Sequence, residues 1–298
     1  MRITTNTLSE NIVRQIQQLG TQQAKLQTQV ATGQRIFQPE DNPTAVGRVL
    51  GLESEQRRLS QFANNAGRAL EVSQATFSGL QQLKKVSDRA TEIGTLGTGA
   101  IGTDASRAYA SEVDQLLEHT LQLSNTRFRN DYLFAGTAAD ASPFTVTRDA
   151  AGKVTTAAYV GNSDRSAIQL SENSTITPGS TGDTNLGLRD FINQLVALRD
   201  ALSTGDSAGV VSAQTTLIAT EDRLVSSLAE HGGVQLRIEA NRAQQQQRGD
   251  NLETLISGET DADMPSTIVR LNQSQTAYQA ALQSAANIMR ISLLDYIK

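Results

Sequence analysis

The chain has 298 residues, and its hydrophobic content of 38% together with 22 glycines is typical of a protein with a buried core. The net charge is −5 and no block of like charge occurs, which argues against nucleic acid or an anionic membrane as the main partner. No run of 18 apolar residues is present, so we expect no membrane insertion. The polar N-terminal segment lacks the apolar stretch of a cleaved Sec signal.

The first predicted helix covers residues 6–33 and carries a heptad seam. The steps along the seam alternate between three, four and seven residues, with Gln23 in the skipped place, and this pattern suits a helix that buries one stripe against another helix. The seam consists of Ile12, Ile16, Leu19, Leu26 and Val30. Gly33 ends the helix, and residues 34–44 form a turn-rich link with two prolines.

Further helices are predicted over residues 45–93, 106–128, 186–201 and 207–256. Between them, residues 132–183 are rich in Thr, Val, Gly, Ser and Asp, and short strands are predicted at 143–148, 153–160, 166–171 and 175–177. Because the helical halves must return to each other, we expect this β insert to project from the bundle into solvent. We also expect the bundle to fold without it.

The last predicted helix begins at Pro265 and carries a second seam with Gln275 in the skipped place. This seam consists of Ile268, Leu271, Tyr278, Leu282, Ala285 and Met289. From Pro265 to Leu294 only Arg270 and Arg290 are charged, and Gln, Ser, Thr, Asn and Ala can be buried at lower cost than ions. Both ends are therefore expected to be covered on more than one side, as in a subunit of an assembly. An intramolecular bundle without partners is the alternative.

Together these patterns predict a mainly α fold with a β insert: a long-helix bundle with paired terminal coiled-coil helices and a small mostly-β domain. Residues 1–44 and 262–298 are expected to be terminal coiled-coil assembly segments. Residues 45–130 and 186–261 are expected to form the helical bundle domain, and residues 131–185 the β-rich insert domain.

The sequence offers no catalytic, cofactor-binding or metal-binding constellation. The G-x-G-x-x-G pattern at residues 97–102 follows a helix, whereas a dinucleotide-binding turn follows a strand. His119 and His231 have no second histidine at i+4, and cysteine is absent. Glu259, Asp261 and Asp263 lack the spacing of a calcium loop. We therefore expect a protein that is not an enzyme and that needs no cofactor.

Five short stretches carry a resemblance to a known family. They are Met1–Asn6 (MRITTN), Ala31–Ile36 (ATGQRI), Pro39–Pro43 (PEDNP), Asn130–Thr137 (NDYLFAGT) and Ser292–Ile297 (SLLDYI). The chain resembles the flagellin superfamily, and the LFAGT and DYI pieces are more similar to its hook–filament junction members than to filament flagellins. Asn42 stands where the family usually has a second aspartate, and it keeps a short polar turn residue there.

The resemblance implies a structural subunit of the bacterial flagellum that joins the hook to the filament. It implies export through the flagellar type III apparatus with an export chaperone, without a cleaved signal, and an extracellular location. The implied partners are copies of itself, hook-associated protein 1 and flagellin. We take the two seams as the expected assembly interface. A filament flagellin and a soluble coiled-coil adapter remain the alternatives.

Overall fold

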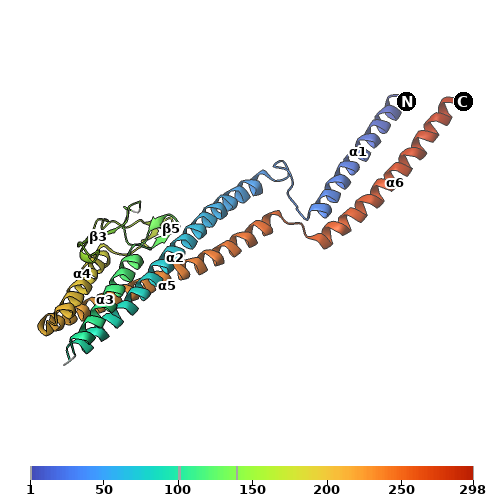
Figure 1. Cartoon of the computed structure of the whole chain (residues 1–298). Coiled ribbons are helices and arrows are strands. Elements are labelled where there is room, and N and C mark those ends of the chain that lie inside the picture. The colour runs from blue at the N-terminus through green and yellow to red at the C-terminus, as the bar shows by residue number, and fades with distance from the viewer. Residues whose placement is uncertain (1, 100–101, 139, 298) are drawn as a thin grey trace. The chain divides into compact units, whose positions relative to one another are not determined.

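The computed structural model describes residues 2–99, 102–138 and 140–297, with side chains described for residues 10–287 within these ranges (Figure 1). The described residues form six helices, and most of the predicted helices are confirmed within a few residues at each end. They are α1 (Arg2–Thr32), α2 (Pro43–Gly97), α3 (Thr103–Ser124), α4 (Gly182–Thr204), α5 (Ser207–Thr260) and α6 (Met264–Ile297). The mainly α fold with a β insert is confirmed.

Three antiparallel hairpins lie between α3 and α4. They pair β1 (Arg127–Phe128) with β2 (Asp131–Tyr132), β3 (Phe144–Arg148) with β4 (Val154–Tyr159), and β5 (Ile168–Ser171) with β6 (Ser174–Ile176). The last two were predicted. The first was not, because the helical pattern was extended to residue 128, whereas α3 ends at Ser124.

The end of α3 is explained by the side chain of Asn125. Its Oδ1 accepts a hydrogen bond from Phe144 N and its Nδ2 donates to Phe144 O, both at 3.0 Å. Asn125 thereby pairs with the edge of β3 as a strand residue would, and the chain turns away from the helix. Arg129 then adopts a left-handed φ of 59° in the turn between β1 and β2.

The chain forms two compact units. Residues 1–58 and 248–298 make up what we call the terminal unit, and residues 59–247 the central unit. Within the terminal unit, α1 and α6 pack side by side and run antiparallel, so that the start of α1 and the end of α6 share one end of the pair (Figure 1).

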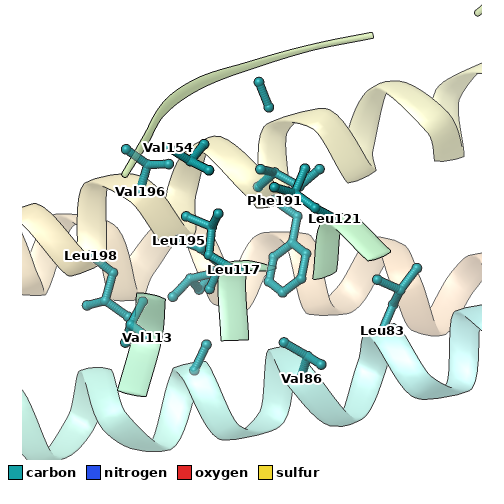
Figure 2. Close-up of a cluster of buried hydrophobic side chains, with 14 of the residues drawn as sticks. Leu83, Val86, Val113, Leu117, Leu121, Val154, Phe191, Leu195, Val196 and Leu198 are labelled. Atoms are coloured by element: carbon teal, nitrogen blue, oxygen red, sulfur yellow. The ribbon is translucent and has the colours of Figure 1, made fainter. Parts of the chain in front are cut away.

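The central unit has one main hydrophobic core, to which α2, α3, α4, α5 and the β3–β4 hairpin all contribute. Figure 2 shows its centre, where Phe191 and Leu195 of α4 meet Leu117 of α3 and Leu83 of α2. Helix α4 is started by Thr181, whose Oγ1 accepts from Thr184 N at 3.0 Å, and it ends where Gly205 takes a left-handed φ of 69°.

We expected the β insert to project from the bundle into solvent, but it packs against the helices. Phe144, Val154 and Ala157 are buried in the main core with α3 and α4, and Val154 appears in the same cluster as Val196 in Figure 2. The β5–β6 hairpin buries Leu170 and Ile176 in a second cluster against α2 and α5; the helix residues of this cluster are Ala66, Ala69, Leu70 and Ile238. The error arose because strands were taken as a separate layer, although their alternating apolar residues needed a surface to cover.

Candidate assembly interface

The predicted seam of α1 faces α6. Leu26 is buried, and the remaining seam residues are half-buried, as is Gln23 in the skipped place; they are Ile12, Ile16, Leu19 and Val30. Gly20 also lies on this face. A Cβ at Gly20 would lie 3.6 Å from Cε2 of Tyr278, so the tyrosine ring of α6 rests over this glycine.

The face of α6 that packs on α1 follows a strict alternation of four and three residues. Its members are Thr267, Leu271, Ser274, Tyr278, Ala281 and Ala285, all buried or half-buried. The predicted Leu271 and Tyr278 therefore lie on this face. Thr267 and Ser274 were missed because they are small and polar, although continuing the alternation backwards from Tyr278 would have found both.

Two other predicted residues lie on the outer side of α6. Ile268 and Leu282 are 42% and 44% exposed, and because 14 residues separate them they share one face of the helix. Val269 is 54% exposed but lies on a different side of the helix. The side chain of Met289 lies outside the described side chains. Among the described residues, α6 thus has a face packed on α1 and, beside it, two exposed apolar residues without a partner on α1, Ile268 and Leu282, which we call the outer stripe.

The link after α1 is fastened to the turn between α5 and α6. Arg35 N donates to Thr260 O at 2.6 Å, and Ala262 N donates to Gly33 O at 2.8 Å, on either side of a β-bridge between Gln34 and Asp261. Gly33 has a left-handed φ of 73°, which a glycine adopts at no steric cost. These bonds join the two places where the terminal helices leave the pair.

Ion pairs reinforce this junction. The guanidinium of Arg48 donates to both carboxylate oxygens of Glu259 at 2.9 Å, and this pair lowers the pKa of Glu259. Lys25 Nζ donates to Asp41 Oδ1 at 2.6 Å. The other oxygen of Asp41 accepts from the backbone N–H groups of Phe37 at 3.1 Å and Gln38 at 3.0 Å. The bond from Lys25, helped by these two, lowers the pKa of Asp41 to about 2.

The stretch at residues 130–137 anchors the β insert. Asn162 bonds it three times: its Oδ1 accepts from Thr137 N at 2.8 Å, its Nδ2 donates to Thr137 Oγ1 at 2.8 Å, and its backbone N donates to Ala135 O at 3.2 Å. Phe134 is fully buried in the main core. Gly136 has a left-handed φ of 68°, and a Cβ there would overlap the side-chain oxygen of Asn162. The motif is therefore explained by packing, without any ligand.

The residues that were weighed for chemistry are not brought together. His119 is exposed on α3, whereas His231 of α5 is 3% exposed and burial lowers its pKa. The glycine pattern at 97–102 joins the end of α2 to the start of α3 rather than a strand to a helix. In the described part of the chain, no cluster of three or more His, Asp or Glu side chains is placed to hold a metal ion. No helix in that part is long and apolar enough to cross a membrane.

Comparisons with known proteins agree with this architecture. The family model described as the bacterial flagellin N-terminal helical region matches residues 3–139. Flagellar hook-associated protein 3 of Escherichia coli K12 is 24% identical over 100% of both chains. The N-terminal part of the chain thus matches the flagellin family, and the whole chain is similar to flagellar hook-associated protein 3. Flagellar hook-associated protein 3 of Salmonella typhimurium LT2 is 28% identical, over 61% of this chain and 56% of that protein.

A solved structure shows the same fold. It is described as a putative flagellar hook-associated protein from Vibrio parahaemolyticus, and it matches with a TM-score of 0.67 at 17% identity. The match covers 74% of this chain and 100% of that one.

Proposed function

We propose that this chain is a structural subunit of the bacterial flagellum that joins the hook to the filament and assembles through its terminal helices. The observation that carries the assembly mechanism is the outer stripe of α6, which lies on the helix that also packs on α1. Its place in the flagellum is supported by the similarity to proteins named hook-associated protein 3 along the whole chain.

In a free subunit the outer stripe is exposed to water. Ile268 and Leu282 are each a little less than half exposed, and covering an aliphatic side chain fully contributes about 1.5–3 kcal/mol. Arg270 is the only charged residue between positions 268 and 282, so a second helix that lies along the stripe desolvates few ions. Burial of this stripe against a neighbouring subunit would therefore favour polymerisation over a solvated monomer.

The finer parts of the proposal follow the same assignment. Residues 1–44 and 262–298 would be the assembly segments, residues 45–130 and 186–261 the helical bundle, and residues 131–185 the insert that packs on it. Ten of the eleven seam residues, all but Ala285, would line contacts within and between subunits. The partners would be copies of this chain, hook-associated protein 1 and flagellin. Export would use the flagellar type III apparatus and a chaperone, without a cleaved signal. The protein would act outside the cell, and its role would be structural rather than enzymatic.

Localisation of the protein on flagella tests this proposal. Sheared flagella from the source bacterium would be analysed by immunoblotting and by immunogold labelling, with a strain that lacks the gene as the control. A label confined to the junction between hook and filament is the expected result. A label along the whole filament would indicate a filament flagellin instead. A signal found only in the cytosol would indicate the soluble adapter and would overturn the proposal.

A further inference from the structure

The two hydrophobic clusters of the central unit are separated by a polar stretch. On α2 the second cluster ends at Leu70, and the main core begins at Leu80. The buried positions of α2 between them hold Ser73, Thr76 and Gly79. Where a continuous core would place large apolar side chains, α2 thus offers two hydroxyl groups and a glycine.

Helix α5 has a polar stretch at the same level, where His231 is 3% exposed. The hydrogen bonds between the two helices show that they run antiparallel, and one of them joins Lys84 Nζ to Glu221 Oε1 at 3.4 Å. Ser73 lies eleven residues before Lys84, and His231 lies ten residues after Glu221. Because both helices have the same rise per residue, Ser73 and His231 are level. Gln235 lies one turn further along the same side of α5.

We call this group of five residues, from Ser73 to Gly79 on α2 and from His231 to Gln235 on α5, the polar layer. Three of its buried atoms have no hydrogen-bond partner in the described part of the chain: Ser73 Oγ, His231 Nδ1 and Gln235 Nε2. Water would pair with these atoms if the layer opened, whereas opening either cluster would expose large aliphatic side chains.

The helix backbone is also weak at this level. Gly232 and Gly233 follow His231 directly, and glycine destabilises a helix interior because it loses more conformational freedom than other residues. No heavy atom lies within 4 Å of a Cβ added at either glycine, so packing does not require them. Side chains and backbone therefore both make the polar layer the place where the central unit opens most easily.

Two arginines of the β insert hold the helices at this level. Arg129, in the turn between β1 and β2, pairs with Glu71 of α2. Arg165, between β4 and β5, donates to Glu230 of α5 at 3.5 Å. The two glutamates lie within two residues of Ser73 and His231 along their helices. The insert thus bonds to both helices beside the polar layer.

We propose that the polar layer is a hinge of the central unit, which the two arginines of the insert hold closed. When the hinge opens, the two hydrophobic clusters stay folded, and α2 and α5 bend between them. The hinge adds to the assembly function proposed above and does not depend on it.

Amide hydrogen exchange of the purified full chain, followed by mass spectrometry of peptic fragments, tests the hinge. We expect the amides of residues 228–235 to exchange at least about tenfold faster than those of residues 217–224 and 238–245. A hinge requires protection on both of its sides. Equal exchange in the three segments, or exchange that changes steadily along α5 as in a helix that frays from one end, would overturn the proposal.

Glycine substitutions provide a matched comparison. The double variant Gly232→Ala, Gly233→Ala should fold, because both added Cβ atoms meet open space. It should slow the exchange of residues 228–235 by at least about fivefold, since it stabilises the helix at the hinge. Gly67→Ala, in α2 outside the polar layer and with equally open surroundings, is the control and should leave this exchange unchanged. No slowing in the double variant, or equal slowing in the control, would contradict the hinge.

The two arginines are tested separately with Arg129→Gln and Arg165→Gln. Both ion pairs are partly exposed, so we expect exchange of residues 228–235 to become only roughly two- to fivefold faster. Arg148→Gln breaks another pair between the insert and a helix, with Glu118 of α3, and should leave this exchange unchanged. If neither variant exceeds Arg148→Gln, the insert does not hold the hinge closed, and that part of the proposal is wrong.

Discussion

Asn193 of α4 bonds both backbone groups of Ala157 in β4: its Oδ1 accepts from Ala157 N at 2.8 Å, and its Nδ2 donates to Ala157 O at 3.1 Å. Asn125 does the same for Phe144 at the opposite edge of the hairpin. The two amides therefore occupy hydrogen-bonding positions at which another strand could add. They also fix the insert to the helices that bury its apolar side.

Asn193→Ala should destabilise the central unit by about 1–3 kcal/mol, because it leaves a buried backbone N–H and C=O without partners. This corresponds to a fall of roughly 2–4 °C in Tm per kcal/mol for a unit of this size. Thermal unfolding followed by circular dichroism measures the change. Asn173→Ala, at the exposed turn of the β5–β6 hairpin, is the matched control and should have little effect. If both substitutions lower the Tm equally, the hydrogen bonds of Asn193 to Ala157 do not stabilise the central unit.

Gly136→Ala should be severely destabilising. Gly136 combines a left-handed φ of 68° with direct overlap between an added Cβ and Asn162. Gly152 has a similar φ of 82° but no heavy atom within 4 Å of an added Cβ, so Gly152→Ala isolates the backbone strain, which costs about 1–2 kcal/mol. Urea unfolding of both variants separates the two effects. If Gly136→Ala lowers the free energy of unfolding no more than Gly152→Ala does, the loop around Asn162 can move to accommodate the added Cβ without cost.

His231 should make the folded protein less stable as the pH falls below about 6.5. Burial lowers its pKa from the model-compound value of 6.5, whereas the unfolded chain keeps the ordinary value. Between the two pKa values the unfolded state binds the extra proton, so the free energy of unfolding decreases as the pH falls and levels off once both states are protonated. Glu230 opposes the lowering and Arg165 adds to it. Unfolding of His231→Gln between pH 7 and 5 should lose this slope, whereas His119→Gln, at an exposed site, should keep it.

Asp41 should change the stability in the same direction as His231, but at lower pH. Because its pKa is lowered from 3.8 to about 2, its bonds stabilise the link fully above the ordinary value and are lost as the pH falls from there towards 2. Carbon-13 NMR of the carboxyl group measures the titration directly. Lys25→Met should move the pKa of Asp41 back towards its ordinary value, since Lys25 makes the largest contribution to the lowering.

The sequence predicted the elements well and their burial less well. Helices and the longer strands were read from periodicity and turn residues, because these are local properties. The docking of the insert depends on side chains such as Phe134, Asn162 and Asn193, which meet partners far away in the chain. No local pattern reveals such pairs. The expectation that the bundle folds without the insert stays a prediction, and the burial of Phe144 and Val154 in the main core argues against it.

The candidate interface shows the same limit at a single helix. Charge depletion led to the expectation that α6 is covered on more than one side, which stays a prediction. The choice between sides failed because large apolar residues were preferred over small polar ones. Ile268 and Leu282 are larger than Thr267 and Ser274, yet the smaller pair lies against α1. Small residues let the two helices approach closely, and the size of a side chain does not reveal this.

Leu282→Asp and Tyr278→Asp separate the two sides of α6. Leu282 is 44% exposed, so an aspartate there remains solvated in the monomer, and we expect normal helix content and normal resistance of the terminal unit to limited proteolysis. Against a neighbouring subunit the same carboxylate would lose its solvent without a partner, at a cost of several kcal/mol, and incorporation into flagella should be lost.

Tyr278→Asp places the charge on the face that packs on α1, where the ring lies over Gly20. The pair of helices should then loosen in the monomer itself, and trypsin should cut within residues 1–32 and 264–297 faster than in the unsubstituted chain. Both variants are expected to fail in motility assays, so proteolysis of the purified monomers is the deciding measurement. If Leu282→Asp is cut as fast as Tyr278→Asp, then Leu282 supports the helix pair rather than the contact between subunits. If Leu282→Asp still builds complete flagella, the outer stripe is not a polymer contact.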